Sequence, residues 1–165
     1  IRPKKKPVFI DKKHLYAHGG ESAFFSAGDS REVVEYKGAK FRLLVCYDLR
    51  FPVWARNTTG HGYDILLVVA NWPQIRILYW DALLPARAVE NQCYICGVNT
   101  VGDDGLGLHY NGHSVAYDTR LQPIVHFDDN EEGTKIADFD IEQLHHYREV
   151  LPLWQDADRF QFVNV

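Results

Sequence analysis

The sequence contains no methionine, only three cysteines, and no apolar run long enough to cross a bilayer. A membrane-spanning helix needs about 18 or more consecutive apolar residues. The charged segment followed by an apolar stretch that marks a secretory signal is also missing. An odd number of cysteines without the spacing of a disulfide framework is typical of free thiols in a reducing compartment. We therefore expect a soluble cytoplasmic protein that does not bind a membrane.

An excess of positive charge is lacking as well. Eighteen Lys and Arg residues face 22 Asp and Glu residues, which gives a formal charge of −4 and a pI near 6.0. The one basic cluster, "RPKKK" at 2–6, is short and is typical of a solvated turn at residues 3–5. Because a general electrostatic attraction to phosphate is absent, we expect no nucleic-acid partner.

What is present fits one globular domain over residues 1–165. The chain is 46% hydrophobic and 24% charged, and it contains no repeat and no low-complexity linker. It opens on Ile1 as though within a strand, and we predict that it is not the whole gene product.

Segments with strand and helix patterns alternate along the chain, which predicts an α/β fold. Several of the predicted strands are continuous apolar runs, "DILLVVAN" most clearly, as expected for strands covered on both faces. The predicted strands are Val8–Ile10, Val33–Tyr36, Phe41–Cys46, Ile65–Ala70, Tyr94–Thr100, His113–Tyr117 and Thr134–Asp140.

The predicted helices are Pro52–Thr58, Ile75–Asn91 and Ile141–Val150. Pro85 interrupts the middle of the second one and predicts a kink or a break there. The stretches "GHGYD", "GDDGLG" and "FDDNEEG" predict turns. Residues 147–165 contain Trp154 and Phe160 without a clear period. They predict a tail that packs on another surface or makes a dimer contact.

Cys46 lies where the apolar strand "FRLLV" runs into "YDLRFPVWAR". Free cysteine is among the most buried residue types, so a plain core position is one interpretation. The other is a nucleophile at a strand-to-helix elbow, with Pro52 in the first helical turn. Backbone N–H groups and a helix N-terminus at such an elbow would lower the pKa of the thiol and could hold an oxyanion.

The candidates for partners of this thiol are ambiguous when each is taken alone. Lys12 in "DKKHL" and Glu21 in "GGESAFFSAG" are each also compatible with a solvated loop. Histidines that could act as the base of a cysteine protease are His14, His109 and His113.

Two further motifs favour ordinary structural explanations. Cys93 and Cys96 form a C-x-x-C pair, but at the start of a strand residues three apart point to opposite faces, which argues against metal chelation. "GDDGLG" lacks the lysine and the hydroxyl residue of a phosphate-binding P-loop.

Five stretches in order together resemble the nitrilase superfamily of carbon–nitrogen hydrolases. They are "VFIDKKHL", "CYDLRFP", "ANWP", "ARAVENQCYICGVNTVG" and "YNGHSVAYD". "CYDLRFPVWARN" and the closing "YREVLPLWQDADRF" are similar to the omega-amidase branch, which hydrolyses the side-chain amides of 2-oxoglutaramate and 2-oxosuccinamate. The resemblance extends from Pro3 to about Phe162.

The resemblance implies a four-layer α-β-β-α sandwich and a Glu–Lys–Cys triad. It places Cys46 at the nucleophile, Lys12 at the catalytic lysine and Glu21 at a second, supporting glutamate. The general-base glutamate belongs to the first third of the family's chain, upstream of Ile1. We therefore expect the chain to correspond to the C-terminal two thirds and to fold poorly by itself, because sheet edges and core faces would lie uncovered.

The mechanism that the resemblance implies needs no metal and no organic cofactor. Lys12 and the backbone N–H of Tyr47 would hold the oxyanion. Arg50 would either pair with Asp48 or Glu90, which we favour, or hold a substrate carboxylate, and Trp72 would line the pocket mouth or pack in the core. The implied partners are a small-molecule amide and a second subunit in a homodimer. A non-catalytic protein with an assembly role and a cysteine protease are the alternatives.

Overall fold

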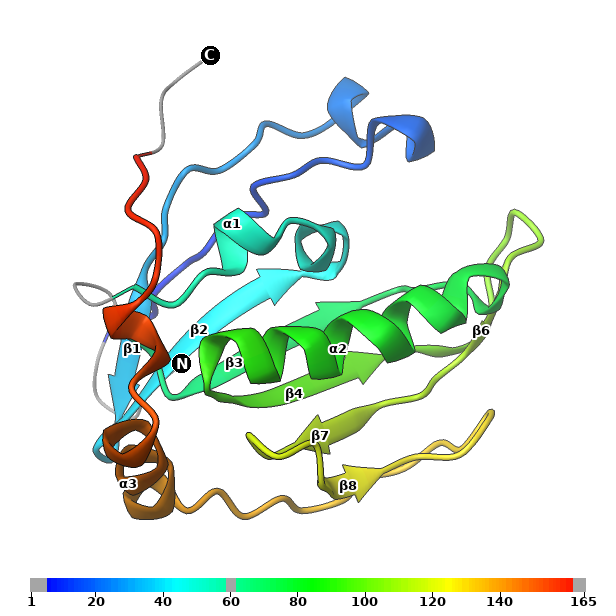
Figure 1. Cartoon of the computed structure of the whole chain (residues 1–165). Helices are drawn as coiled ribbons and strands as arrows, with labels where there is room; N and C mark the ends of the chain where they lie inside the picture. Colours follow the sequence, from blue (N-terminus) through cyan, green and yellow to red (C-terminus); the bar gives the residue numbers. More distant parts are fainter. Residues whose placement is uncertain (1–5, 59–61, 162–165) are drawn as a thin grey trace.

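A six-stranded mixed sheet forms the centre of the molecule in the computed structural model, which describes residues 6–58 and 62–161 (Figure 1). Its strand order is β1-β2-β3-β4-β7-β8. The central strands β2, β3 and β4 are parallel, and the outer ones pair antiparallel. The strands of this sheet are β1 Val33–Tyr36, β2 Ala39–Val45, β3 Ile65–Ala70, β4 Tyr94–Asn99, β7 Val115–Tyr117 and β8 Pro123–His126.

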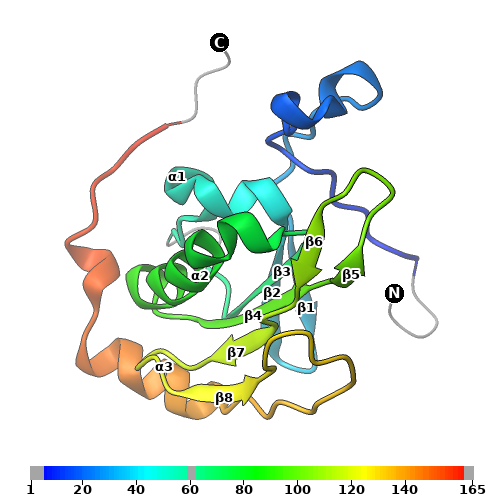
Figure 2. The same ribbon diagram turned by 90° about the vertical axis from the view of Figure 1, so that its right-hand side faces the viewer.

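A separate two-stranded hairpin, β5 Val101–Asp103 with β6 His109–Asn111, extends beyond the end of β4. The α-helices are α1 Pro52–Ala55, α2 Ile77–Asn91 and α3 Ile141–Val150. Short 3₁₀ turns are η1 Ala17–Gly19, η2 Glu21–Ala23, η3 Cys46–Arg50, η4 Gln74–Arg76 and η5 Leu153–Gln155. Figure 2 shows α1 and α2 together on one face of the sheet.

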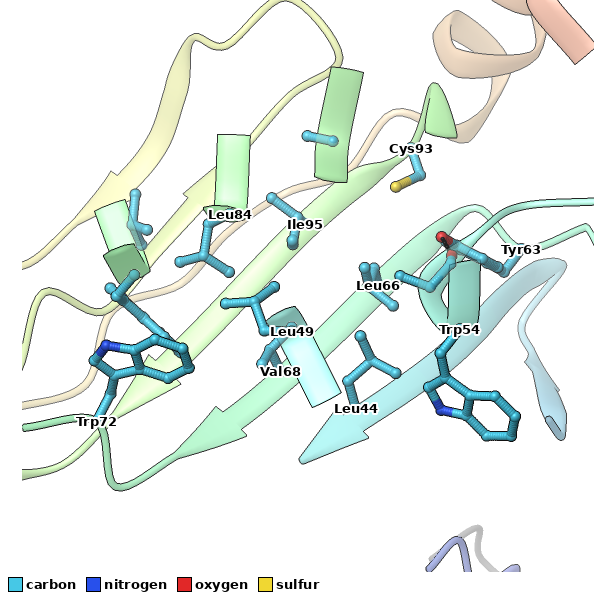
Figure 3. Packing of buried hydrophobic residues seen from close by; sticks show 14 residues of the cluster. Leu44, Leu49, Trp54, Tyr63, Leu66, Val68, Trp72, Leu84, Cys93 and Ile95 are labelled. Atoms are coloured by element: carbon cyan, nitrogen blue, oxygen red, sulfur yellow. Dashed lines mark hydrogen bonds between the residues drawn. The ribbon is translucent and has the colours of Figure 1, made fainter. Parts of the chain in front are cut away.

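The main core lies between that face and α2 (Figure 3). Leu66, Val68 and Ile95 point from the sheet toward Trp80 and Leu84 of α2, and all five side chains are fully buried. At Gly97 of β4, an added Cβ would lie 2.5 Å from Leu84 Cδ1 and 2.7 Å from Trp80 Cζ2. The absence of a side chain there therefore lets α2 lie close to the sheet.

The opposite face of the sheet is covered only in part by the described residues. Leu144 of α3 packs with Ile65 and Tyr94 in a second buried cluster. Farther along the strands, Leu43, Val69 and Val98 occupy positions alternate to the main core and are 38%, 52% and 51% exposed. Since side chains alternate along a strand, the apolar runs have one face under α2 and one face partly in solvent.

The α/β class is confirmed, and Val33–Tyr36, Ile65–Ala70 and Ile141–Val150 have the predicted bounds. Two predicted strands are wrong. Val8–Ile10 forms no strand, and Phe9 is 80% exposed. Thr134–Asp140 runs as an extended connection to α3 (Figure 1). Contacts with the Tyr94 side chain hold its end in place.

Within that connection, the Tyr94 hydroxyl donates to the carbonyl of Asp140 at 2.8 Å, and the rings of Tyr94 and Phe139 lie 5.0 Å apart. Side-chain packing on Tyr94 therefore holds this segment in place, although no neighbouring strand pairs with it. β5, β6 and β8 were not predicted as such, although "GDDGLG" is the turn between β5 and β6, as expected.

Several predicted bounds differ from the structure. The strand over Phe41–Cys46 ends at Val45, Tyr94–Thr100 ends at Asn99, and only Val115–Tyr117 of the strand at His113–Tyr117 pairs. The helix at Pro52–Thr58 ends at Ala55, since the Asn57 side chain bonds the backbone of Tyr63.

α2 begins at Ile77 after the turn η4, and it continues through Pro85 without a break. The predicted turn at residues 3–5 lies outside the described residues.

The segment after α3 is anchored at its start. Arg148 donates to Asp64 Oδ1 at 2.9 Å and to the carbonyl of Tyr63 at 2.7 Å, and the Gln92 amide donates to the carbonyl of Leu151. Trp154 is 48% exposed. Across residues 6–58 and 62–161, no helix combines the length and the apolarity needed to cross a bilayer.

Candidate active site

A cavity of about 870 Å³ opens where the parallel strands β2, β3 and β4 end. Its walls combine the ends of these strands with the segment 11–26 and the hairpin β5–β6. Such an edge is where α/β sheets hold their ligands, because the loops that leave the strands diverge there. The lining includes three of the predicted residues, Lys12, Glu21 and Cys46.

Cys46 occupies a sharp elbow between β2 and the 3₁₀ turn η3. Its φ angle of 47° is in the left-handed region, which a residue with a Cβ seldom adopts. The Asp48 carboxylate accepts the Val45 N–H at 3.1 Å and so closes the turn. A strained conformation of this kind persists only where the surroundings hold it, and it presents the thiol to the cavity.

Burial dominates the ionisation of the Cys46 thiol and raises its pKa above the ordinary value. The Lys12 charge and backbone hydrogen bonds at Asn71 and Tyr47 act in the opposite direction but do not outweigh burial. The elbow N–H of Tyr47 lowers this pKa in the predicted direction, but desolvation disfavours the thiolate more than the neighbouring groups favour it, so the net shift is upward. A thiol in this state needs a base to become a nucleophile.

Lys12 and Glu21 form a close ion pair beside the thiol. The Lys12 Nζ lies 2.7 Å from Glu21 Oε1 and 2.6 Å from Oε2, and the Tyr16 N–H donates to Oε2 at 2.8 Å. Burial by itself raises the pKa of Glu21, but the hydrogen bonds from Lys12 and Tyr16 and the Lys12 charge leave it below the ordinary value. Glu21 is thus an anion that orients the ammonium of Lys12.

Asp48 connects the two halves of the site, a role that sequence reasoning did not assign to it. Its Oδ1 accepts the His14 N–H at 2.8 Å and lies 2.9 Å from His14 Nδ1, while Oδ2 holds the elbow at Val45. The His14 ring stacks on Phe51 at 3.6 Å. Through these contacts, one buried carboxylate fixes the segment that carries Lys12 against the turn that carries Cys46.

Tyr47, Arg50 and Trp72 line a smaller adjoining cavity of about 300 Å³ that also reaches Cys46. The guanidinium carbon of Arg50 lies 4.9 Å from the ring centre of Trp72 and 4.8 Å from that of Tyr79. The favoured pairing of Arg50 with Asp48 or Glu90 is not what the structure has, since Asp48 bonds His14 and Glu90 bonds Arg87.

Trp72 is held from two sides. It is 3% exposed, packs 5.6 Å from Trp80, and donates its Nε1 hydrogen to the carbonyl of Arg76. It is therefore both a core residue and a wall of the smaller cavity. Asn99 at the end of β4 accepts the Trp72 N–H at 2.6 Å and donates to its carbonyl at 2.9 Å, which fixes the turn after β3.

The three histidines proposed for a protease do not line the Cys46 cavity. His14 bonds Asp48, His109 bonds Asp103 and Asn130, and His113 bonds Asp81 and Asp129. All of them are engaged in structural contacts away from the thiol.

All three cysteines are free thiols. Cys93 is fully buried in the main core, whereas Cys96 follows Ile95 of that core and points to the other face of β4. The two thiols therefore do not converge, as predicted. Within the described parts of the chain, no cluster of three or more His, Cys, Asp or Glu residues is arranged to hold a metal ion.

The chain belongs to the carbon–nitrogen hydrolase family, whose sequence profile matches residues 7–149. It is 47% identical over 162 residues to the omega-amidase YafV of Escherichia coli strain K12. The aligned residues are 98% of this chain and 62% of that protein. A 2-oxoglutaramate amidase of Bacillus subtilis strain 168 is 35% identical over 145 residues, which are 88% of this chain and 55% of that protein.

A solved relative shares the fold. The crystal structure of XC1258 from Xanthomonas campestris, a CN-hydrolase superfamily protein with an arsenic adduct in its active site, matches with a TM-score of 0.85 and 40% identity. The match covers 93% of this chain and 60% of XC1258. The layer of helices on a mixed sheet is consistent with one half of an α-β-β-α sandwich. The chain spans less than two thirds of the length of these relatives.

Proposed function

We propose that the full-length protein is an omega-amidase that releases ammonia from 2-oxo acid amides such as 2-oxoglutaramate and 2-oxosuccinamate. The observation that carries the proposal is the convergence of Cys46, Lys12 and Glu21 on one cavity at the ends of the parallel strands. Relatives named as an omega-amidase and a 2-oxoglutaramate amidase support the same reaction.

In the proposed mechanism, a carboxylate base removes the proton from Cys46, and the thiolate attacks the amide carbonyl. The resemblance implies that this base is a further glutamate. The raised pKa of the thiol agrees with the need for it, because Glu21 is already bound to Lys12.

The tetrahedral oxyanion would be held by the Lys12 ammonium and the Tyr47 N–H. Collapse of the intermediate breaks the C–N bond, the leaving nitrogen takes the proton from the base, and ammonia departs from a Cys46 thioester. Water, activated by the same base, then attacks the thioester, and the acid leaves as the thiol is restored. These steps use only side chains and water.

We further propose that residues 1–165 are the C-terminal part of a single carbon–nitrogen hydrolase domain within a cytoplasmic homodimer. The exposed aromatic Trp154 in the tail 147–165 would suit such a contact. The partners in this proposal are a small amide and a second subunit, without nucleic acid or membrane. A purely structural role is less suited to a strained thiol beside an oriented ammonium.

The experiment is ammonia release from 2-oxoglutaramate and 2-oxosuccinamate by the full-length protein. Cys46→Ala should lower kcat by at least about 10³-fold, because the covalent route is lost. Cys96→Ala serves as the matched control, since its half-buried thiol lies outside the cavity, and it should keep the wild-type rate. Activity that survives in Cys46→Ala would remove Cys46 from the mechanism.

A further inference from the structure

Arg76 borders both cavities at Cys46. Its backbone is fixed in the turn η4, since its N–H donates to the carbonyl of Pro73 at 2.9 Å and its carbonyl accepts the Trp72 Nε1 hydrogen at 2.8 Å. Its half-buried guanidinium lies 5.9 Å from the ring centre of Tyr16, which comes from the segment carrying Lys12. The side chain thus begins from a rigid turn at the rim of the site.

The charge of Arg76 has no anionic partner within the described residues, where no carboxylate oxygen lies within 4.0 Å of it. The nearby carboxylate of Asp104 is occupied, because it accepts the N–H groups of Leu106 and Leu108 and the hydroxyl of Tyr110. A half-buried guanidinium without a counter-ion has unused hydrogen-bond donors.

This charge acts inside the Cys46 cavity. The pKa of Tyr110, which lines that cavity, is raised first by burial and by its hydrogen bond to Asp104. Cys46 raises it further and Arg76 opposes the rise, so both groups act on one hydroxyl. Arg76 and the nucleophile therefore share one electrostatic environment.

Two other cations, Lys12 and Arg50, line these cavities. Lys12 is held by both oxygens of Glu21. Arg50 also has no carboxylate within 4.0 Å among the described residues, but its guanidinium packs against two rings, those of Trp72 and Tyr79. Arg76, by contrast, contacts a single ring, that of Tyr16, and has no carboxylate partner among the described residues.

We propose that Arg76 binds the substrate carboxylate, at the end of the molecule remote from the amide that Cys46 attacks, and so selects carboxylate-bearing amides over neutral ones. This inference rests on the proposed amidase function and deepens it. A guanidinium matches a carboxylate with two parallel hydrogen bonds, and a site built for that contact discriminates against ligands that lack it.

The test compares full-length wild type with Arg76→Gln and Arg76→Lys. Arg76→Gln should raise KM for 2-oxoglutaramate about 10- to 100-fold, because it removes a charge-assisted pair, and should change kcat less than about threefold. The inhibition constant of glutarate should rise in parallel, and that of pentanamide should stay unchanged. Arg76→Lys keeps the positive charge but loses the paired N–H donors of the guanidinium. Its KM for 2-oxoglutaramate should therefore lie between those of wild type and Arg76→Gln.

Arg120→Gln is the control, since Arg120 is exposed in the turn before β8 and outside both cavities. It should match wild type in every constant. An unchanged KM in Arg76→Gln, an equal loss of glutarate and pentanamide binding, or a fall in kcat alone would overturn the role of Arg76. If Arg76→Gln does not fold, the same criteria apply to Arg76→Lys.

Failure of the amidase proposal would be recognised separately. It would show as no ammonia release by the wild type, or as full activity in Cys46→Ala, and both measurements keep Arg76 intact.

Discussion

At the scale of single residues, the positions of Lys12 and Cys46 depend on hydrogen bonds to carboxylates that do not react themselves. Burial raises the pKa of the Cys46 thiol, and Glu21 orients Lys12. Asp48 touches neither Lys12 nor the cavity, yet it bonds the backbone on both sides of the site, at His14 and Val45. It is a positioning residue for the pair of Lys12 and Cys46.

Replacing Asp48 by Asn should therefore damage both stability and activity. The amide would turn an N–H donor toward donors of Val45 or His14, and we expect a loss of about 1–3 kcal/mol in the free energy of unfolding. The displaced Lys12 should lower kcat about 10²-fold. Urea unfolding and ammonia release measure the two effects, and Asp138→Asn, an exposed change, should alter neither.

At the scale of elements, a histidine joins α2 to the loop after β8. His113 lies 3.0 Å from Asp81 of α2 through Nδ1, and its Nε2 meets Asp129 of the loop. Because both ring nitrogens face carboxylates, the ring donates on both sides only as imidazolium. Burial by itself lowers the pKa of His113, but the hydrogen bonds and charges of the two aspartates leave it raised.

This raised pKa predicts the direction of a pH effect. A group whose pKa is raised by folding adds stability that is complete below its unfolded value, near 6.5, and is lost as the pH rises through the folded value. The difference in Tm between wild type and His113→Gln should thus be largest below pH 6.5 and shrink above it. Thermal unfolding of the full-length protein from pH 5.5 to 8.5 tests this.

The exposed His146 on α3 provides the control for the pH series. His146→Gln should follow the wild type at every pH. A Tm difference for His113→Gln that grows with pH would contradict the assignment.

At the scale of the whole molecule, the described residues leave one sheet face partly open. Leu43, Val69 and Val98 lie on that face, on the three parallel strands. An apolar face of this kind in a parallel sheet is ordinarily covered by a further layer. The relatives that this chain matches are longer than the matched region, which is consistent with a further layer on this face.

We therefore expect Leu43→Asp to destabilise the full-length protein by at least about 2 kcal/mol, because a charge would be buried without a partner. Ile136→Asp changes a side chain that is 86% exposed in the connection before α3 and should cost less than about 0.5 kcal/mol. Chemical unfolding of both variants gives the comparison. Equal, small losses would mean that this face stays in solvent.

The sequence by itself determined the class of fold, the strands under the helix layer and the candidate nucleophile. Runs such as Ile65–Ala70 are long, apolar and bounded by turn residues, so local pattern and burial agree there. The order of five motifs also indicated Lys12 and Glu21, which the structure brings to one cavity with Cys46.

Only the tertiary structure decided the burial, the hydrogen bonds and the electrostatic effects among those residues. The local pattern around Cys46 does not tell how far distant segments desolvate the thiol, so the net rise in its pKa followed from the packed site. The link through Asp48 to His14 joins positions 34 residues apart, and Arg76 stands beside Cys46 because β2 and β3 are neighbours. Strands were likewise predicted at Val8–Ile10 and Thr134–Asp140, where no neighbouring strand within the described chain completes a ladder. Local pattern specifies which face is apolar, and the packing of distant segments specifies what covers it.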